Sequence, residues 1–162
     1  MKFSKFLALA AITAGFSGAS LAQGLPSTKV LTVDVAQTIA HEAMMACRAN
    51  GYKVSVLVVD AGNVQKAFLR DDGAGMGTVE VARLKANTVM ANGRPSGPPA
   101  GLPAGAPNPP AAVPGTVTFP GGVPIKVGDD LIGAVAVSGA PGGDKDAACA
   151  NAALAKVADR LK

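Results

Sequence analysis

Four polar residues in the middle of the chain have the types and the spacing of a small ligand-binding site. Lys85 and Thr88 are three positions apart in a segment expected to be helical, so they lie on one face of that helix. Arg70 and Asp72 close the strand predicted before it, where a loop can direct side chains into a cleft. Arginine and lysine recognise carboxylates, and threonine adds a neutral oxygen. These four are the candidate ligand-binding residues; the alternative is that Arg70 pairs with Asp72 on the surface and Thr88 packs inside.

His41 is the only histidine of the chain, which makes it the first candidate for a metal ligand. Helical spacing places it at the edge of the buried face of a predicted helix, where an ordinary boundary residue is the alternative. Met76 is a second candidate, because it stands between glycines where core packing does not require a large side chain. With one histidine and two cysteines, the sequence excludes multi-histidine zinc sites and cysteine-rich zinc modules.

The two cysteines stand near ends of predicted helices. Cys47 ends the first helix and Cys149 begins the last. If these helices pack antiparallel, the two ends are neighbours, and an oxidising compartment permits a disulfide. The geometry of a disulfide is strict, however, and the helical wheel places Cys149 away from the expected apolar stripe. The sequence leaves open a disulfide, two free thiols and a contact between subunits.

The sequence favours a binding protein over an enzyme. It contains no G-x-S-x-G elbow, no cysteine–histidine pair at a suggestive spacing and no cluster of metal ligands. The glycine-rich residues 139–143 precede a predicted helix and suit either an anion or, as the better interpretation, a structural cap. They lack the lysine and hydroxyl ending of a nucleotide P-loop.

The expected elements alternate in an order typical of an α+β domain. Thr32 and Thr78 are the predicted caps of the first two helices. The predicted order is helix, two strands, helix, loop, two strands, helix, at about 33–50, 54–59, 64–69, 78–91, 92–118, 119–127, 131–137 and 144–161. This order favours an antiparallel sheet with helices packed on it.

Residues 1–22 have the pattern of a secretory signal peptide. Lys2 and Lys5 precede an apolar run, and small residues lead to Ala22. Cleavage there leaves one domain at 23–162, with 13 basic against 11 acidic residues. Such a near-neutral chain has no electrostatic motive to bind nucleic acid. We expect a periplasmic or secreted protein with no stable membrane insertion after cleavage.

A proline-rich loop is expected at about 92–118. Eight of the 20 residues at 95–114 are prolines, and none of the 20 is charged. Such a segment forms neither a helix nor a central strand and buries too little surface to fold alone. It is therefore a loop within the domain and not a second domain.

Five motifs taken in order resemble those of the GlcG/HbpS family. They lie at 56–63, 70–74, 85–88, 120–125 and 133–139, and Asp146 and Cys149 follow them. The resemblance covers nearly all of the chain after residue 22 except the proline-rich loop. It implies a profilin-like domain that forms homo-oligomers. A fold of this kind constrains function less than it constrains architecture.

The resemblance implies a small-ligand-binding protein whose cofactor is haem or a related tetrapyrrole. It places the ligand pocket on the helix that carries Lys85 and Thr88. The small number of aromatic residues after Ala22 favours a shallow or subunit-shared haem site over a deep one. One alternative is an accessory binder of a small organic acid of the glycolate type, or an enzyme acting on one, with Arg70 and Lys85 against the carboxylate. Another is a structural oligomerisation module.

Overall fold

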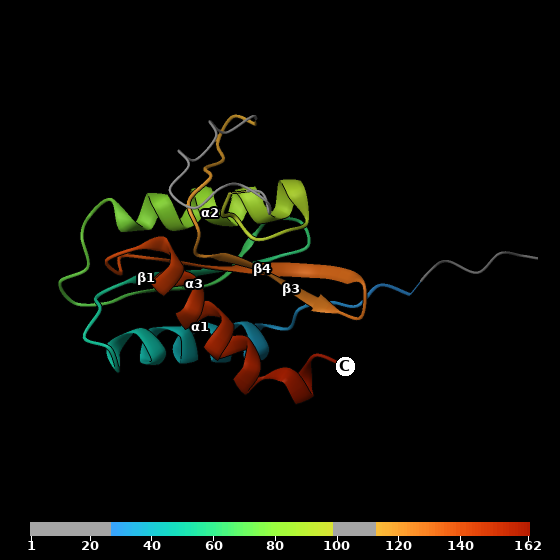
Figure 1. The fold of residues 1–162 in the computed structure, drawn as a ribbon. Helices are drawn as coiled ribbons and strands as arrows, with labels where there is room; N and C mark the ends of the chain where they lie inside the picture. The colour runs from blue at the N-terminus through green and yellow to red at the C-terminus, as the bar shows by residue number, and fades with distance from the viewer. Residues whose placement is uncertain (1–26, 99–112) are drawn as a thin grey trace, which may run out of the picture.

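The structure is a computed structural model that describes residues 27–98 and 113–162 (Figure 1). The predicted signal peptide and the middle of the proline-rich loop lie outside the described residues. Within those two ranges, no helix combines the length and the apolar character that a bilayer crossing requires.

A four-stranded antiparallel sheet is covered by helices on both faces. Its strand order is β2-β1-β4-β3, so that β2 and β3 are the edges. Helix α2 lies on one face, and helices α1 and α3 lie on the other (Figure 1). In chain order the elements are α1 (Val33–Arg48), β1 (Ser55–Asp60), β2 (Gln65–Arg70), α2 (Thr78–Asn92), β3 (Gly122–Val127), β4 (Asp130–Ser138), α3 (Gly143–Lys156) and a short 3-10 helix (Ala158–Arg160). The predicted α+β architecture is confirmed.

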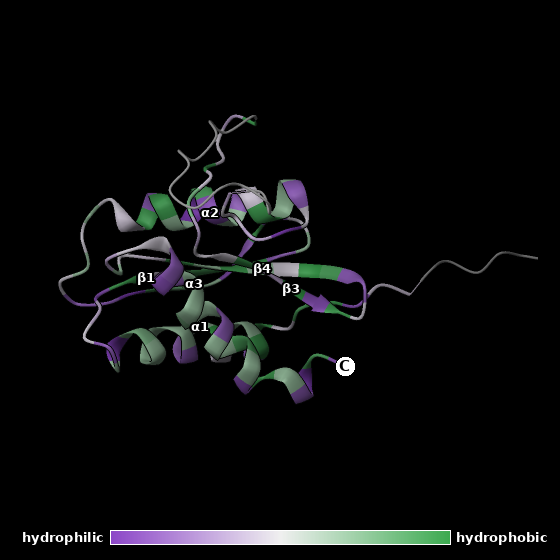
Figure 2. Cartoon of the chain, viewed as in Figure 1, coloured by the Kyte–Doolittle hydropathy of each residue, from purple (hydrophilic) through white to green (hydrophobic). Residues whose placement is uncertain are grey.

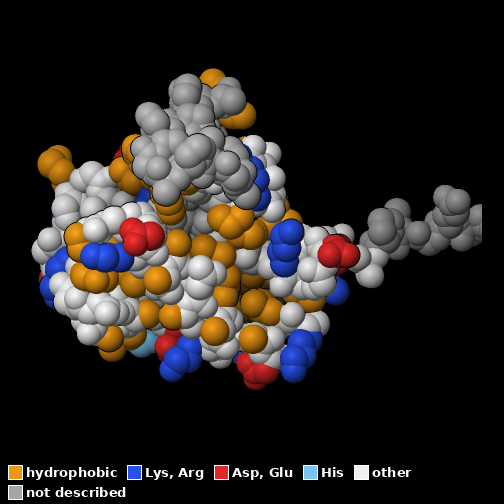
Figure 3. Space-filling model, in the orientation of Figure 1, with side chains coloured by type: hydrophobic (Ala, Val, Ile, Leu, Met, Phe, Trp, Pro, Cys, Tyr) orange, Lys and Arg blue, Asp and Glu red, His pale blue; other side chains and the backbone are white. Residues whose placement is uncertain are grey.

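The hydropathy of the strands follows from their place in the sheet. β1 and β4 are central and have helices on both faces, so their apolar residues form nearly continuous runs (Figure 2). β2 is an edge strand, and Ala67 is the one residue of its six that is buried. On the surface in view, apolar side chains gather over α3 and β3, and charged side chains lie around them (Figure 3).

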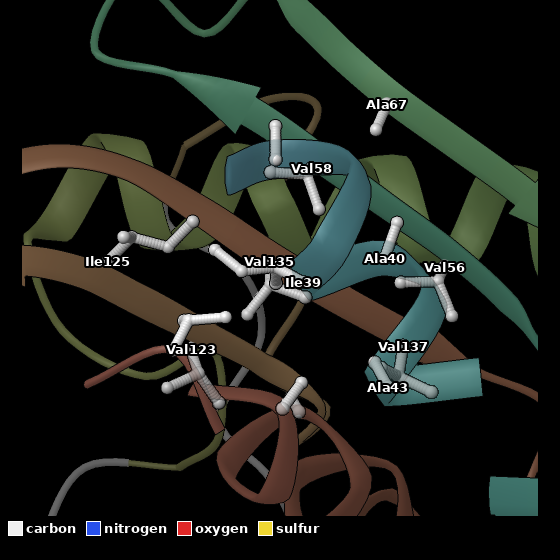
Figure 4. Close-up of a cluster of buried hydrophobic side chains, with 14 of the residues drawn as sticks. Ile39, Ala40, Ala43, Val56, Val58, Ala67, Val123, Ile125, Val135 and Val137 are labelled. Atoms are coloured by element: carbon white, nitrogen blue, oxygen red, sulfur yellow. The ribbon is translucent and has the colours of Figure 1, made fainter. Parts of the chain in front are cut away.

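Alternate residues of the central strands build two separate cores. Val56 and Val58 face α1 and α3, whereas Leu57 and Val59 face α2. The larger core includes Ile39, Ala40, Ala43, Val123, Ile125, Val135 and Val137 (Figure 4). The small residues of α1 in this core let the helix pack closely on the sheet. Because these residues face the sheet, the opposite face of α1 remains free for other contacts.

Two predicted helix ends need correction. Thr32 caps α1 as expected, because its hydroxyl accepts a hydrogen bond from the Val35 amide at 3.4 Å. Thr78, in contrast, is the first residue of α2, and Gly77 occupies the cap position. The Thr78 hydroxyl instead bonds to the Gly75 carbonyl at 2.7 Å and to the Ser55 hydroxyl at 2.8 Å. The last helix ends at Lys156, before the 3-10 turn, and not near residue 161.

Cys47 and Cys149 form a disulfide, with their Cα atoms 5.4 Å apart. Of the three states that the sequence left open, the structure therefore shows the bridge. The buried positions of α3 are Asp146, Cys149, Ala150 and Ala153, which repeat at helical spacing. The expectation that Cys149 lies away from the buried face of the last helix was wrong, because Cys149 shares that face with Asp146, Ala150 and Ala153.

Removal of the disulfide is expected to lower the free energy of unfolding substantially. The two cysteines are 102 positions apart, and in the chain-entropy model the closure of a loop of about 100 residues stabilises by about 4–5 kcal/mol. Urea unfolding with and without a thiol reductant measures this loss. The double variant Cys47→Ala/Cys149→Ala is the control, since its unfolding midpoint should be low and should not respond to reductant. Equal midpoints for the oxidised and reduced wild type would contradict the expectation.

Candidate functional site

Lys85 is buried between the two helical layers and forms an ion pair with Asp146. Its Nζ atom lies 2.7 Å from Asp146 Oδ2 and donates a second hydrogen bond to the Val137 carbonyl at 2.9 Å. Only 2% of the Lys85 side chain and 4% of the Asp146 side chain are exposed. The φ angle of Gly121 is +128°, and a Cβ atom there would lie 2.6 Å from the Val137 carbonyl oxygen, so this position requires glycine. The pair therefore joins α2, β4 and α3 around a glycine.

Burial and pairing shift the pKa of each of these two groups in opposite directions. Burial lowers the pKa of Lys85 and raises the pKa of Asp146, because each charged form loses water. Their mutual hydrogen bond and attraction oppose both shifts. The second oxygen of Asp146 accepts a hydrogen bond from the Ala140 amide at 2.9 Å. Both charges are thus satisfied by the protein itself.

Thr88 and Ser96 hold the two ends of the proline-rich loop. The buried Thr88 hydroxyl accepts a hydrogen bond from the Val117 amide at 2.8 Å and lies 2.8 Å from the Val117 carbonyl. Ser96, also buried, donates to the Phe119 carbonyl at 2.7 Å and accepts from the Gly122 amide at 2.8 Å. These contacts place residues 113–119 against α2 (Figure 1). The outward side of Thr88 is therefore occupied by the protein's own backbone.

Arg70, the last residue of β2, and Asp72, in the loop that follows, flank the buried Asp71. Arg70 donates through Nη2 to the Ala74 carbonyl, and both Arg70 and Asp72 are exposed. Asp71 is 2% exposed and accepts two hydrogen bonds from Arg48, at 2.9 and 3.0 Å. Lys53 lies 3.9 Å away. Chiefly because of the Arg48 hydrogen bonds, the pKa of Asp71 is held below its ordinary value.

The expected convergence of the four candidate residues on one cleft is wrong. Lys85 and Thr88 point into the protein and are saturated by protein groups, whereas Arg70 and Asp72 face solvent. Thr88 packs inside, as in the alternative interpretation, but Arg70 bonds to a carbonyl and not to Asp72. A direct role for Arg70 or Asp72 in ligand binding stays a prediction.

His41 lines an open hollow of about 410 Å³ between α1 and the edge strand β2. Gln37 lies one turn earlier on α1 and shares this face. On the β2 side, Ala67 and Leu69 pack toward α1, whereas Phe68 packs against the other core. The hollow is lined by Gln37, Ala40, His41, Gln65, Lys66, Ala67, Phe68 and Leu69. It combines an exposed imidazole with a floor of small and aliphatic side chains.

The second metal candidate stands apart from this hollow. Met76 is 91% exposed in the loop before α2 and is not among the residues that line the hollow. Among the residues that the structure describes, no three or more histidine, cysteine or acidic side chains are grouped so that they could hold a metal ion. Of the two candidates, His41 is the one that lines this hollow.

The family is settled by the extent of a sequence match. The family model described as "Haem degrading protein HbpS-like" matches residues 31–155. The chain belongs to the HbpS-like family. No protein of curated function matches it. The resemblance predicted from the five motifs is therefore confirmed.

Solved structures agree with this HbpS-like assignment. A crystal structure of HbpS is 34% identical, with a TM-score of 0.72 over 82% of this chain and 94% of that one. A double mutant of Streptomyces reticuli HbpS is 33% identical, with a TM-score of 0.72 over 92% and 98% of the two chains. A complex of PduOC with haem is 24% identical, with a TM-score of 0.65 over 78% and 94%, and shares the fold.

Three groups that organise this HbpS-like domain are not among the candidate residues predicted from the sequence. The role of Asp71 was not readable, because its partner Arg48 lies 23 positions earlier. Ser96 carried no signal, because one serine among prolines and glycines is ordinary in a loop. The pair Gly121 and Gly122 did carry one, since adjacent glycines before a buried strand indicate close backbone approach.

Removal of one member of the Lys85–Asp146 pair is expected to destabilise the fold. Lys85→Met leaves a buried carboxylate without a partner, which should lower the free energy of unfolding by about 3–5 kcal/mol. Lys85→Met/Asp146→Leu should recover most of that loss, because neither charge is then buried. The exposed pair of Glu80 and Arg83 supplies the control, as Glu80→Gln should barely move the urea midpoint. A Lys85→Met protein as stable as wild type would contradict this.

Asp71 should contribute to the acid sensitivity of the fold. Its pKa is lower in the folded than in the unfolded chain, so its stabilisation is present above the unfolded value of about 3.9 and is lost as pH falls through the folded value. Asp71→Asn should therefore lower the thermal midpoint clearly at pH 7 and much less near pH 2. Asp72→Asn, at the exposed neighbour, should have little effect at either pH. A difference between Asp71→Asn and wild type that stays constant with pH would refute the assignment.

Proposed function

We propose that this protein binds haem or a closely related tetrapyrrole in the hollow between α1 and β2, with His41 as the ligand of the iron. The observation that carries the proposal is that the only histidine of the chain lines this open hollow of about 410 Å³. The description of the HbpS-like family as haem degrading supports it. PduOC, which shares the fold, is described as a complex with haem.

The surroundings of His41 suit an axial ligand. The side chain is exposed on α1, and within the described residues no hydrogen bond or ion pair engages it. An imidazole nitrogen is the commonest protein ligand of haem iron. When bound, the iron supplies the redox and ligand-binding chemistry of the group. The chain contributes a nitrogen donor held on a rigid helix.

The walls of the hollow suit one face of an apolar ring. Ala40 and Ala67 are buried at its floor, and Leu69 is half-buried beside them. The hollow is open along the edge of β2, so the carboxylates of a bound tetrapyrrole would remain in water. Lys66 lines the hollow and lies 3.8 Å from Asp60. This arrangement supports a shallow site, as the small number of aromatic residues suggested.

The site also bears on the alternatives. A clamp of Arg70 and Lys85 on a small organic acid has no support, because the Lys85 ammonium already binds Asp146 and the Val137 carbonyl.

We propose further that the protein works outside the cytoplasm, as a homo-oligomer. The signal-peptide pattern and the disulfide support an oxidising compartment. No strand of residues 27–98 or 113–162 pairs with the outer edge of β2, which supports a contact between copies there.

Titration with haemin tests the site. Wild-type protein should give a saturable Soret band, and His41→Ala should weaken binding by at least about tenfold, since a metal ligand is lost. Met76→Leu is the matched control, because it removes the other candidate ligand and should leave the band unchanged. Circular dichroism of His41→Ala should show an intact fold, since the side chain is exposed. Unchanged binding and an unchanged band in His41→Ala would refute the proposal.

A further inference from the structure

His41 and Met45 form an exposed pair of metal-ligating side chains on α1. They are four positions apart, so they are neighbours on one face of the helix, with Cβ atoms about 5–6 Å apart. His41 is exposed, and Met45 is 42% exposed. Neither side chain takes part in a hydrogen bond or ion pair with another described residue. An imidazole nitrogen and a thioether sulfur are therefore both available on the same patch of the helix.

The order of the two residues along α1 favours their convergence on one ion. Long side chains in an α-helix point back toward the helix N-terminus, over the preceding turn. Met45 comes after His41, so its side chain extends toward the imidazole and not away from it. A methionine side chain is unbranched and flexible, so its sulfur can adjust to an ion that the imidazole holds.

Among the described residues, Met45 is the sulfur-bearing residue that stands beside His41 with a free, exposed side chain. Met44 is only 6% exposed and packs in the larger core. Met76 and Met90 belong to the loop before α2 and to α2 itself, the helix on the opposite face of the sheet. Both cysteines are joined in the disulfide, so neither offers a thiolate. A thioether forms no disulfide and stays available in an oxidising compartment.

The charges around the pair suit a monovalent cation. Asp34, two turns before His41, adds one exposed negative charge. The other charged side chains nearby each have a partner of opposite sign, with nitrogen–oxygen distances of 4.0 Å for Lys156 and Glu42, 2.9 Å for Arg48 and Asp71, and 3.8 Å for Lys66 and Asp60. A monovalent cation is therefore not repelled. A hard divalent cation finds no cluster of carboxylates within the described residues.

We propose that His41 and Met45 bind Cu(I) through the imidazole nitrogen and the thioether sulfur. Soft thioether ligands select Cu(I), and imidazole also suits copper. A closed-shell monovalent ion is satisfied by two such ligands, so no third side chain is needed. The inference goes beyond the proposed haem site and shares His41 with it, so the two occupants compete for one imidazole. Met45 does not line the haem hollow, and it therefore distinguishes the two sites.

Calorimetric titration with Ag(I) in a chloride-free buffer tests this site, because Ag(I) has the charge and ligand preference of Cu(I) without its oxidation by air. Wild-type protein should bind one Ag(I) per chain at a tight site. Met45→Leu and His41→Ala should each weaken this binding by at least about tenfold, since one of the two ligands is lost. Met76→Leu is the matched control, because it removes a thioether that is 91% exposed elsewhere and should leave the tight site unchanged.

A spectroscopic measurement locates the bound ion. In protein with isotope-labelled methionine methyl groups, the NMR resonance of Met45 should shift at the lowest Ag(I) concentrations, before that of Met76. Competition for Cu(I) with a colorimetric chelator, under anaerobic conditions, should rank the variants in the same order. Unchanged Ag(I) binding in Met45→Leu, or an initial shift at Met76, would overturn the proposal.

Haemin binding separates this proposal from the haem site. Met45→Leu should bind haemin as the wild type does, because Met45 does not line the hollow. If His41→Ala loses haemin but keeps Ag(I), the copper proposal is wrong and the haem site stands. If haemin binding does not depend on His41 but Ag(I) binding depends on both His41 and Met45, the haem site is wrong and the copper proposal stands.

Discussion

The buried ion pair of Lys85 and Asp146 is the constraint on which the arrangement of layers depends. A charge removed from water is tolerated only with a partner and full hydrogen bonding, and here each charge has the other plus a backbone group. Because Lys85 belongs to α2 and Asp146 to α3, the two helices on opposite faces of the sheet are coupled. Gly121 leaves the space in which they meet.

The two faces of the sheet consequently have different roles. On the α2 side, Thr88 and Ser96 accept hydrogen bonds from the Val117 and Gly122 amides, which follow the proline-rich loop. The chain after the loop is thereby held against α2. On the α1 and α3 side, a recess at the rim holds His41 beside β2. The proposed haem site therefore lies at the rim of the domain, where a rigid helix presents a polar side chain beside an apolar floor.

Much of the fold could be predicted, because local patterns carry it. Thr32 before an apolar stripe and the apolar runs of β1 and β4 are readable from neighbouring residues. The role of Lys85 was not readable, because its partner lies 61 positions away and a helical lysine is ordinarily exposed. Cys149 was assigned to the wrong side of α3 for the same reason, since the buried Asp146 defines that face. His41 was recognised, but its recess required β2 to be placed beside α1.

The position of the two cysteines governs when they can be joined. Cys47 is synthesised about one hundred residues before Cys149, so the first thiol stays unpaired until nearly all of the domain exists. With only two cysteines in the chain, each has a single possible intramolecular partner, and no mispaired isomer competes within one molecule. The disulfide can therefore form only when the domain is nearly complete. Its formation needs an oxidant but no enzyme that rearranges wrong disulfides.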